Sequence, residues 1–270
     1  MRQVLPAVLV TAALGAAFVA SKQGPSRESV IPLSRAVADH EKALDRSSAV
    51  VFPLSADEER EIGARMDATM NREPAAPGTP EASRAALWRE MGQTAAASPL
   101  AARFRGRWEF RAAREGGLNA FALPGGFLYA TDGLIARLSR DPDALLFVAG
   151  HELGHVQLGH TADGYRLGRG AKDPITAVFG GALSVGRVLT QLHFSETQEL
   201  EADAFAVKLL KSVKKDPRAG LRAMDALGLR ADADTKRGAG SVVLEGAADY
   251  FKTHPGSWER RAAIEREASR

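Results

Sequence analysis

The stretch "DPDALLFVAGHELGHVQLGH", residues 141–160, decides the fold, because it places ionisable side chains in an otherwise apolar segment. Asp141 followed by Pro142 is typical of a helix start, with the aspartate as N-cap and the proline in the first turn. We expect this helix to end near Gly159, because glycine is common just past a helix C-terminus. A buried helix would normally carry leucine or alanine at its centre, so the polar residues there need a chemical reason.

The spacing of the three central polar residues indicates a metal site. His151 and His155 are four residues apart, so in a helix they lie on one face, and two neutral imidazoles placed this way can hold one metal ion, usually zinc. Glu152 lies about 100° around the helix, where it can reach a water on that metal but cannot easily join its ligands. This is the HExxH pattern of zinc peptidases, in which the glutamate is the general base.

A catalytic zinc needs a third protein ligand and an open position. The segment "SETQELEADAFAVKLL", residues 195–210, offers the best candidate, because a helix there places Glu199 and Asp203 on its inner face and Glu201 on its solvated face. We therefore predict that Glu199 is the third ligand and that Asp203 accepts the N–H of a ligating histidine. His160 is a weaker alternative ligand, and we expect it on the surface at or past the end of the first helix.

Composition narrows the class of protein. Hydrophobic residues make up 45% of the 270 and charged residues 26%, which is ordinary for a folded domain. The net charge is only +3 and no basic stripe with interleaved aromatic residues occurs, so the sequence predicts no nucleic-acid partner. The absence of cysteine excludes disulfides, thiol catalysis and cysteine-based zinc sites.

The N-terminus predicts export. Arg2 precedes an uncharged apolar run, residues 4–20, and the polar "SKQGPSRES" follows it. This pattern is typical of a signal peptide or a signal anchor, and the length of the run fits either one. We expect a signal peptide or anchor at residues 1–21, a tether at 22–50 and one domain at 51–270. That domain would then lie in the periplasm or on the outer face of a bacterial membrane.

Capping signals and periodicity predict a mainly helical α+β domain with a small sheet. Ser55 and Glu58 form a capping box that should open a helix toward Met70. The apolar residues 174–192 are expected to cover the active site as a helix or loop, or to form a core helix. The other predicted helices are 81–97, 195–211, 217–227, 242–252 and 256–268, and the predicted strands are 107–113 and two strands around a Pro-Gly-Gly turn within 119–134.

Four motifs in order resemble peptidase family M48, the membrane-associated zinc endopeptidases that include the heat-shock protease and the CAAX prenyl protease. They are "NAFALPGGFLYATDGL", "GHELGHVQLGH", "ELEADAFA" and "THPGSWERR", and they span most of residues 55–268. The compact length is closest to that of bacterial periplasmic quality-control members. The resemblance implies a zincin-like fold of the gluzincin type, with one zinc ion on His151, His155 and Glu199.

The resemblance also implies roles for two late residues. His254 and Arg260 match a histidine and an arginine that lie near the metal in this family. Either could hold the oxyanion of the transition state, and His254 could instead be an extra ligand that blocks the resting site. We expect the substrate to lie extended along an edge strand that consists of Phe127, Leu128, Tyr129 and Ala130.

The sequence thus predicts a zinc-dependent endopeptidase that hydrolyses peptide bonds of exported or membrane-associated proteins, in envelope quality control. Its partners would be unfolded or misassembled polypeptides, with membrane contact through the N-terminus. One alternative is a zinc-stabilised, chaperone-like binding module whose proteolysis is latched or absent. Another is a metal hydrolase that acts on a different amide.

Overall fold

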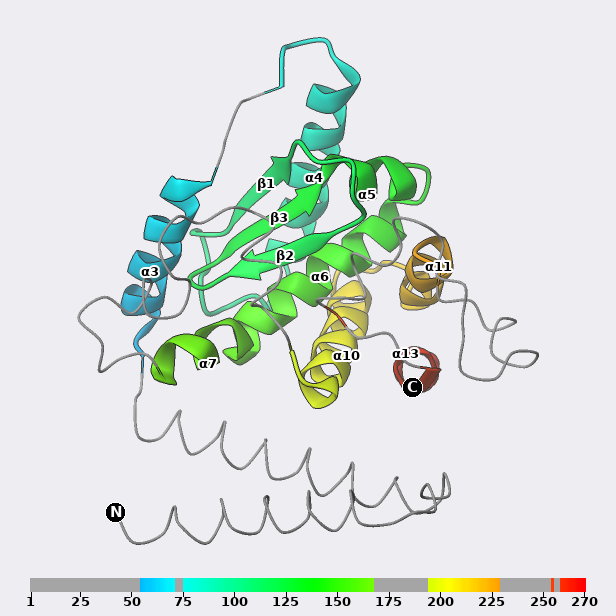
Figure 1. Cartoon of the computed structure of the whole chain (residues 1–270). Helices are drawn as coiled ribbons and strands as arrows, with labels where there is room; N and C mark the ends of the chain where they lie inside the picture. The colour runs from blue at the N-terminus through cyan, green and yellow to red at the C-terminus, as the bar shows by residue number, and fades with distance from the viewer. Residues whose placement is uncertain (1–53, 71–74, 168–193, 229–253, 255–257) are drawn as a thin grey trace, which may run out of the picture. The chain divides into compact units, whose positions relative to one another are not determined.

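A computed structural model describes residues 54–70, 75–167, 194–228, 254 and 258–270, all of which lie within the compact unit Asp45–Arg270. These residues form a mainly helical α+β domain with one three-stranded sheet (Figure 1). None of the helices in the described ranges combines the length and the apolar character needed to cross a membrane. The signal segment at 1–21, the tether at 22–50 and the segments 174–192 and 242–252 fall outside the described residues.

Local capping explains where the first helices begin. Helix α3, Ala56–Thr69, starts at the predicted capping box, in which the Ser55 hydroxyl accepts from the Glu58 amide while the Glu58 carboxylate accepts from the Ser55 amide. Helix α4, Pro80–Ala96, has Thr79 as N-cap and a proline in its first turn. Both helices were predicted within a residue or two of these bounds.

The sheet contains β1 (Glu109–Ala113), β2 (Ala120–Leu123) and β3 (Phe127–Thr131), in the spatial order β1-β3-β2. Strand β3 pairs in parallel with β1 and antiparallel with β2. The expectation that Phe127 to Ala130 form an edge strand is therefore wrong. These residues are the central strand, because both edges of β3 are hydrogen-bonded to neighbours. Among the described residues, β2 is the edge strand on this side of the sheet.

The tight turn between β2 and β3 depends on glycine. Gly125 and Gly126 both have positive φ, at 78° and 93°, which residues with a Cβ rarely adopt. Helix α3 packs directly on this turn, since a Cβ added at Gly63 would lie 1.8 Å from the Pro124 carbonyl oxygen. The turn is thereby held between a helix and the sheet.

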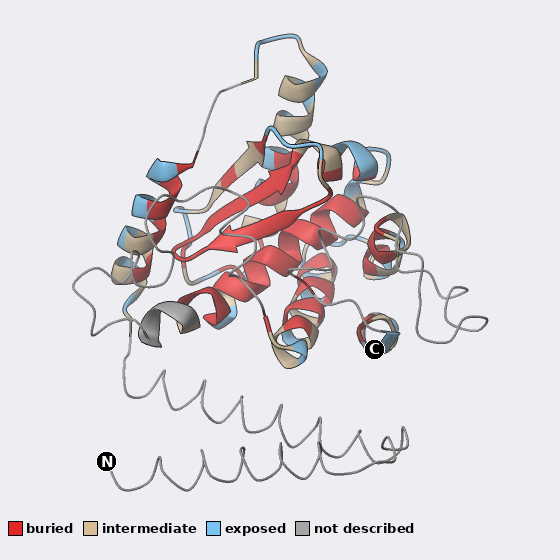
Figure 2. Cartoon of the chain, viewed as in Figure 1, coloured by how far each residue is buried: buried red, intermediate tan, exposed pale blue. Residues whose placement is uncertain are grey.

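Helix α6, Pro142–Leu158, is the predicted metal-binding helix and lies against β2 on one side and α10 on the other (Figure 1). Its N-cap is Asp141, and it ends at Gly159 in the left-handed conformation, as predicted. Figure 2 shows that α6, β2 and β3 are buried along most of their length. Gly150 allows the close approach of α10, because a Cβ at that position would lie 3.5 Å from the Cα of Ala206.

The remaining described helices complete the domain around α6. Helix α10, Glu196–Ser212, begins at a second capping box, formed by Ser195 and Gln198. Two of the other helices, α5 and α7, were not predicted. The bounds are α5 Asp132–Leu138, α7 His160–Leu167, α11 Ala219–Ala226 and α13 Trp258–Ser269.

Candidate metal centre

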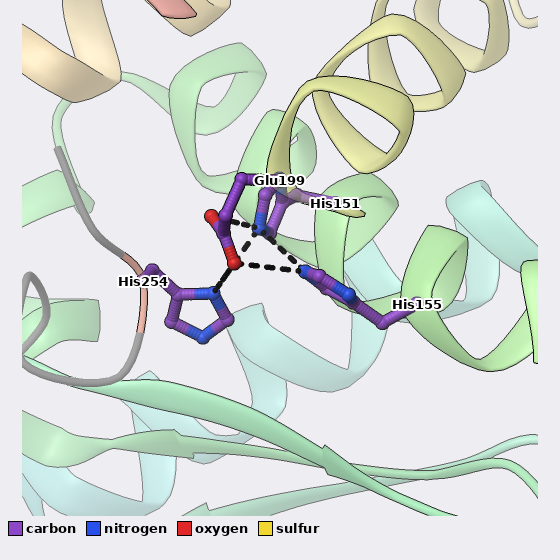
Figure 3. A group of neighbouring side chains, drawn as sticks. All are labelled: His151, His155, Glu199 and His254. Atoms are coloured by element: carbon purple, nitrogen blue, oxygen red, sulfur yellow. Dashed lines mark hydrogen bonds and ion pairs between the residues drawn. The ribbon is translucent and has the colours of Figure 1, made fainter. Parts of the chain in front are cut away.

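Four buried side chains point toward one another between α6, α10 and residue 254 (Figure 3). They are His151, His155, Glu199 and His254, and one potential ligand atom from each lies within 4.8 Å of all the others. Each of the four residues is 0% exposed. Three of them were predicted as metal ligands and the fourth as a residue near the metal.

The imidazole pair comes from one face of α6, as the four-residue spacing predicts. The Nε2 atoms of His151 and His155 lie 3.1 Å apart. The ring of Phe194, which precedes α10, stacks on His155 with centroids 3.7 Å apart. Both histidines therefore direct Nε2 toward a common point, and the Phe194 ring covers one side of His155.

The third side chain comes from α10. The carboxylate of Glu199 lies 3.5 Å from Nε2 of His151 and 3.4 Å from Nε2 of His155. Ligand atoms about 2.0–2.1 Å from a tetrahedral zinc ion would lie roughly 3.4 Å from each other. Two imidazoles and one carboxylate at these separations fit a divalent metal of the zinc type, with a fourth position left for water or substrate.

His254 faces that fourth position. Its Nδ1 lies 3.0 Å from a Glu199 carboxylate oxygen and 3.3 Å from Nε2 of His151. Its Nε2 lies 3.3 Å from the carbonyl oxygen of Ala120 in β2 and 3.3 Å from a carboxylate oxygen of Glu152. In this arrangement His254 connects the candidate metal centre to the edge strand.

Glu152 has the environment of a general base. It is fully buried, and neither of its carboxylate oxygens has a hydrogen-bond partner among the described residues. Burial raises the pKa of this carboxyl group, although the nearby His254 and His151 oppose the shift. A buried carboxylate that lacks a hydrogen bond fits a residue whose partner is a water at the metal.

Asp203 and Arg260 lie behind the ligands. One carboxylate oxygen of Asp203 is 2.9 Å from Nδ1 of His151, which is the contact predicted for it. The Arg260 guanidinium, 1% exposed, donates to both oxygens of Asp203 at 2.7 and 2.8 Å and lies 2.5 Å from Glu199. Arg260 is thus turned toward the carboxylates, where it balances their buried charge.

The charges at the site shift the pKa values of its members. Burial alone would lower the pKa of His151, but the carboxylates of Asp203 and Glu199 raise it to about 9. Burial would raise the pKa of Glu199, but the nearby His254 and the Arg260 guanidinium hold it well below its usual range. Burial lowers the pKa of His155. Glu199 is therefore ionised, as a metal ligand must be.

His160 differs from the prediction. It is only 8% exposed, and its Nδ1 lies 3.0 Å from Nδ1 of His155, so it is neither a surface residue nor one of the clustered ligands. Its Nε2 lies 3.3 Å from the carboxylate of Glu201, whose side chain is 46% exposed on the solvated face, as expected. The sequence "HVQLGH" places His155 and His160 five residues apart, but it does not show that the left-handed turn at Gly159 brings the two rings together.

Comparison with known proteins assigns the chain to a family. The model of peptidase family M48 matches residues 82–268, which is more than half of the chain. The chain belongs to peptidase family M48. Membership classes residues 82–268 as a metallopeptidase domain, and the four clustered side chains lie within the matched range.

Curated relatives carry names of the same kind. Mitochondrial metalloendopeptidase OMA1 of Arabidopsis thaliana is 29% identical over 163 residues, which cover 57% of this chain and 30% of that protein. Metalloprotease LoiP of Escherichia coli (strain K12) is 33% identical over 105 residues, covering 35% and 41%. Mitochondrial metalloendopeptidase OMA1 of Schizosaccharomyces pombe is 28% identical over 167 residues, covering 59% and 46%. The matches thus span less than half of each relative's length.

Proposed function

We propose that this protein is a zinc-dependent endopeptidase with a zincin-like fold of the gluzincin type. The observation that carries the proposal is the convergence of His151, His155 and Glu199 from two separate helices beside the buried Glu152. The family assignment and the names of the relatives support the same activity. Zinc is the metal of choice because two imidazoles and one carboxylate are a common donor set of catalytic zinc.

The residues divide the chemistry among them. When bound, the metal would polarise the scissile carbonyl and lower the pKa of a water toward about 7. Glu152 accepts the proton of the attacking water, since one of its carboxylate oxygens lies 3.3 Å from His254 in the cluster, and then donates that proton to the leaving amine. Asp203 fixes His151 by accepting its Nδ1–H, and Arg260 holds Asp203 and Glu199 in place.

The substrate would lie along β2 instead of the predicted β3. In the antiparallel pair, the Thr131 amide donates to the Asn119 carbonyl, so the backbone groups of Ala120 and Ala122 point away from β3. The carbonyl of Ala120 accordingly faces His254. A peptide added at this edge would run beside α6 and bring its scissile bond to the metal centre.

The position of His254 favours a resting ligand over an oxyanion donor. Its Nδ1 lies among the ligand atoms, and its Nε2 is next to the Ala120 carbonyl that a substrate would use. His254 would therefore have to move before a peptide binds. We call His254 in this position the latch. The alternative function, a chaperone-like binding module, would be a protein in which His254 never leaves this position.

The substrates we propose are unfolded or misassembled proteins of a bacterial envelope, reached by export through the N-terminal segment. The support is the charge pattern of residues 1–21 and the resemblance to periplasmic quality-control members. Mass spectrometry of the mature N-terminus would show whether this segment is cleaved. A mature protein that starts at Met1 in the cytoplasm would contradict the export part of the proposal.

The activity is tested with Glu152→Gln in the full chain, with the exposed Glu90→Gln on α4 as the matched control. Cleavage of an unfolded protein such as casein and the zinc content per chain are measured on the same samples. Glu152→Gln should keep its zinc and lose turnover, while Glu90→Gln keeps both. Unchanged turnover in Glu152→Gln would rule out the mechanism.

The latch is tested with His254→Ala. A faster rate of casein cleavage than wild type would support a latched protease. If wild type, Glu90→Gln and His254→Ala all bind zinc and none cleaves any polypeptide offered, the binding module is the better account.

A further inference from the structure

His160 occupies a position that the proposed chemistry leaves without a role. It is the first residue of α7 and directly follows Gly159, whose φ of 85° and ψ of 8° end α6 and turn the chain back. The turn brings Nδ1 of His160 to 3.0 Å from Nδ1 of His155. Helix α7 is also tied to α10, because Nε2 of Gln198 donates to the Asp163 carboxylate at 3.1 Å.

The orientation of the His155 ring decides which nitrogen donates and which accepts in its contact with His160. Nε2 of His155 faces the cluster, so as a metal ligand it must carry a lone pair, and the ring's hydrogen must then be on Nδ1. That N–H points at Nδ1 of His160, which has to be the acceptor. The hydrogen of His160 is then on Nε2, which is the atom that lies 3.3 Å from the Glu201 carboxylate. One set of tautomers satisfies all three residues.

His151 has an equivalent partner. Its Nε2 also faces the cluster, and its Nδ1 lies 2.9 Å from Asp203, a buried carboxylate that Arg260 balances. The two histidine ligands are thus supported differently. A buried ion pair supports His151, whereas the His160 imidazole and a half-exposed carboxylate on the solvated face of α10 support His155.

We propose that His160 and Glu201 are positioning residues for the metal site. His160 accepts the Nδ1–H of His155, and Glu201 holds His160 in the tautomer that can accept it. The inference rests on the proposed metal site and deepens it, because neither residue touches the metal or the substrate. It also makes part of the metal affinity depend on a side chain that reaches solvent.

A purely structural role for His160 is the competing explanation. In that case His160 fills space under the start of α7, and its loss would lower the stability of the metal-free fold without changing the affinity for zinc. A glutamine at this position distinguishes the two roles, because its amide oxygen can accept the His155 N–H. A leucine of similar size cannot accept that hydrogen bond.

The experiment measures the zinc dissociation constant of the full chain by competition with a chromogenic chelator. The variants are His160→Leu, His160→Gln and Glu201→Ala, with Glu196→Ala as the matched control, since Glu196 is an exposed carboxylate on the same helix. Thermal unfolding of each variant in excess chelator reports the stability of the metal-free fold separately. The absorption spectrum of the cobalt-substituted protein reports the geometry at the ligands.

Loss of an outer hydrogen-bond partner typically weakens metal binding roughly 10- to 100-fold. We expect His160→Leu to weaken zinc binding by that factor and to shift the cobalt spectrum, and His160→Gln to recover most of the loss. Glu201→Ala should weaken zinc binding in the same direction by a smaller factor, and Glu196→Ala should match wild type.

Three results would overturn the inference. The first is a wild-type affinity and cobalt spectrum in both His160→Leu and Glu201→Ala, which would leave the metal site itself intact. The second is a His160→Gln variant as weak as His160→Leu. The third applies if His160→Leu does not fold, because Glu201→Ala then decides alone, and it is an unchanged zinc affinity in Glu201→Ala. A wild-type chain that binds no zinc would instead overturn the proposed function.

Discussion

Replacing Arg260 by leucine should destabilise the fold much more than the same change at the next residue. Arg260 is 1% exposed, and its guanidinium contacts two carboxylates, those of Asp203 and Glu199, that are 0% exposed. Without it, these carboxylates must take up protons or stay buried without a counter-ion. Removing one partner of a buried ion pair typically costs about 3–5 kcal/mol.

The neighbouring Arg261 is the matched control. It belongs to the same helix and makes an ion pair with Asp225, but its side chain is 23% exposed and that of Asp225 is 42% exposed. Exposed pairs contribute about 0–1 kcal/mol to the free energy of unfolding. The two arginines thus differ in burial and partners while sharing chemistry and location.

The assay is thermal unfolding in excess chelator, so that metal binding does not contribute. For a domain of this size, 1 kcal/mol shifts Tm by about 2–4 °C, so Arg260→Leu should lower Tm by roughly 6–20 °C and Arg261→Leu by at most about 4 °C. Equal shifts in the two variants would refute the reasoning. So would a shift below about 4 °C in Arg260→Leu.

Three further predictions concern the scaffold and the metal. Gly63→Ala should destabilise the fold by about 1–3 kcal/mol although alanine favours helix, because its Cβ would lie 1.8 Å from the Pro124 carbonyl oxygen. Gly116→Ala is the control, because a Cβ there meets nothing within 4 Å and should change the stability little. A denaturant titration in which Gly63→Ala is more stable than wild type would contradict the packing of α3. Asp141→Ala should cost about 0.5–2 kcal/mol at neutral pH through loss of the α6 N-cap. The hydrogen bond from Arg222 lowers the pKa of Asp141 below its usual 3.8, so the stability that ionised Asp141 contributes is present above pH 3.8 and is lost as the pH falls. Urea titrations should therefore show a smaller stability difference between wild type and Asp141→Ala in acid than at neutral pH. Chelation should lower Tm and zinc should restore it, and a Tm that does not respond to either would argue against a metal site.

Capping and helical periodicity were sufficient to predict the site's two main helices. Asp141, Gly159 and the capping box at Ser195 act within a few residues, so the sequence alone indicates where α6 and α10 begin or end. The face assignment on α10 followed from the same periodicity, since Glu199 is buried in the cluster and Glu201 is on the solvated side. Local chemistry therefore predicted which side chains would be brought together.

The order of the strands could not be predicted in the same way. The Pro-Gly-Gly turn shows that β2 and β3 are neighbours, but which of them is the edge depends on where β1 pairs. That pairing is parallel and joins residues far apart in the sequence, for example Glu109 with Phe127. Because no local pattern encodes this pairing, the sequence analysis placed β3 at an edge of the sheet, whereas it is the central strand.

The positions of His160 and Arg260 depend on a chain reversal and on partners from distant segments. Helical periodicity ends at Gly159, so it could not predict the left-handed turn that folds His160 back onto His155 and away from the surface. Arg260 was a candidate for the oxyanion because of the resemblance alone. Its contacts with Asp203 and Glu199 depend on the packing of α13 against α10, which no local sequence pattern predicts.

We expect α6 and α10 to bring three side chains to one divalent ion. Diffraction data collected on either side of the zinc absorption edge, from crystals of the full chain grown with zinc, test it most directly. We predict one anomalous peak per chain about 2.0–2.2 Å from Nε2 of His151, Nε2 of His155 and the carboxylate of Glu199. No peak there, or a peak at which the Glu199 carboxylate lies out of coordinating reach, would contradict the account.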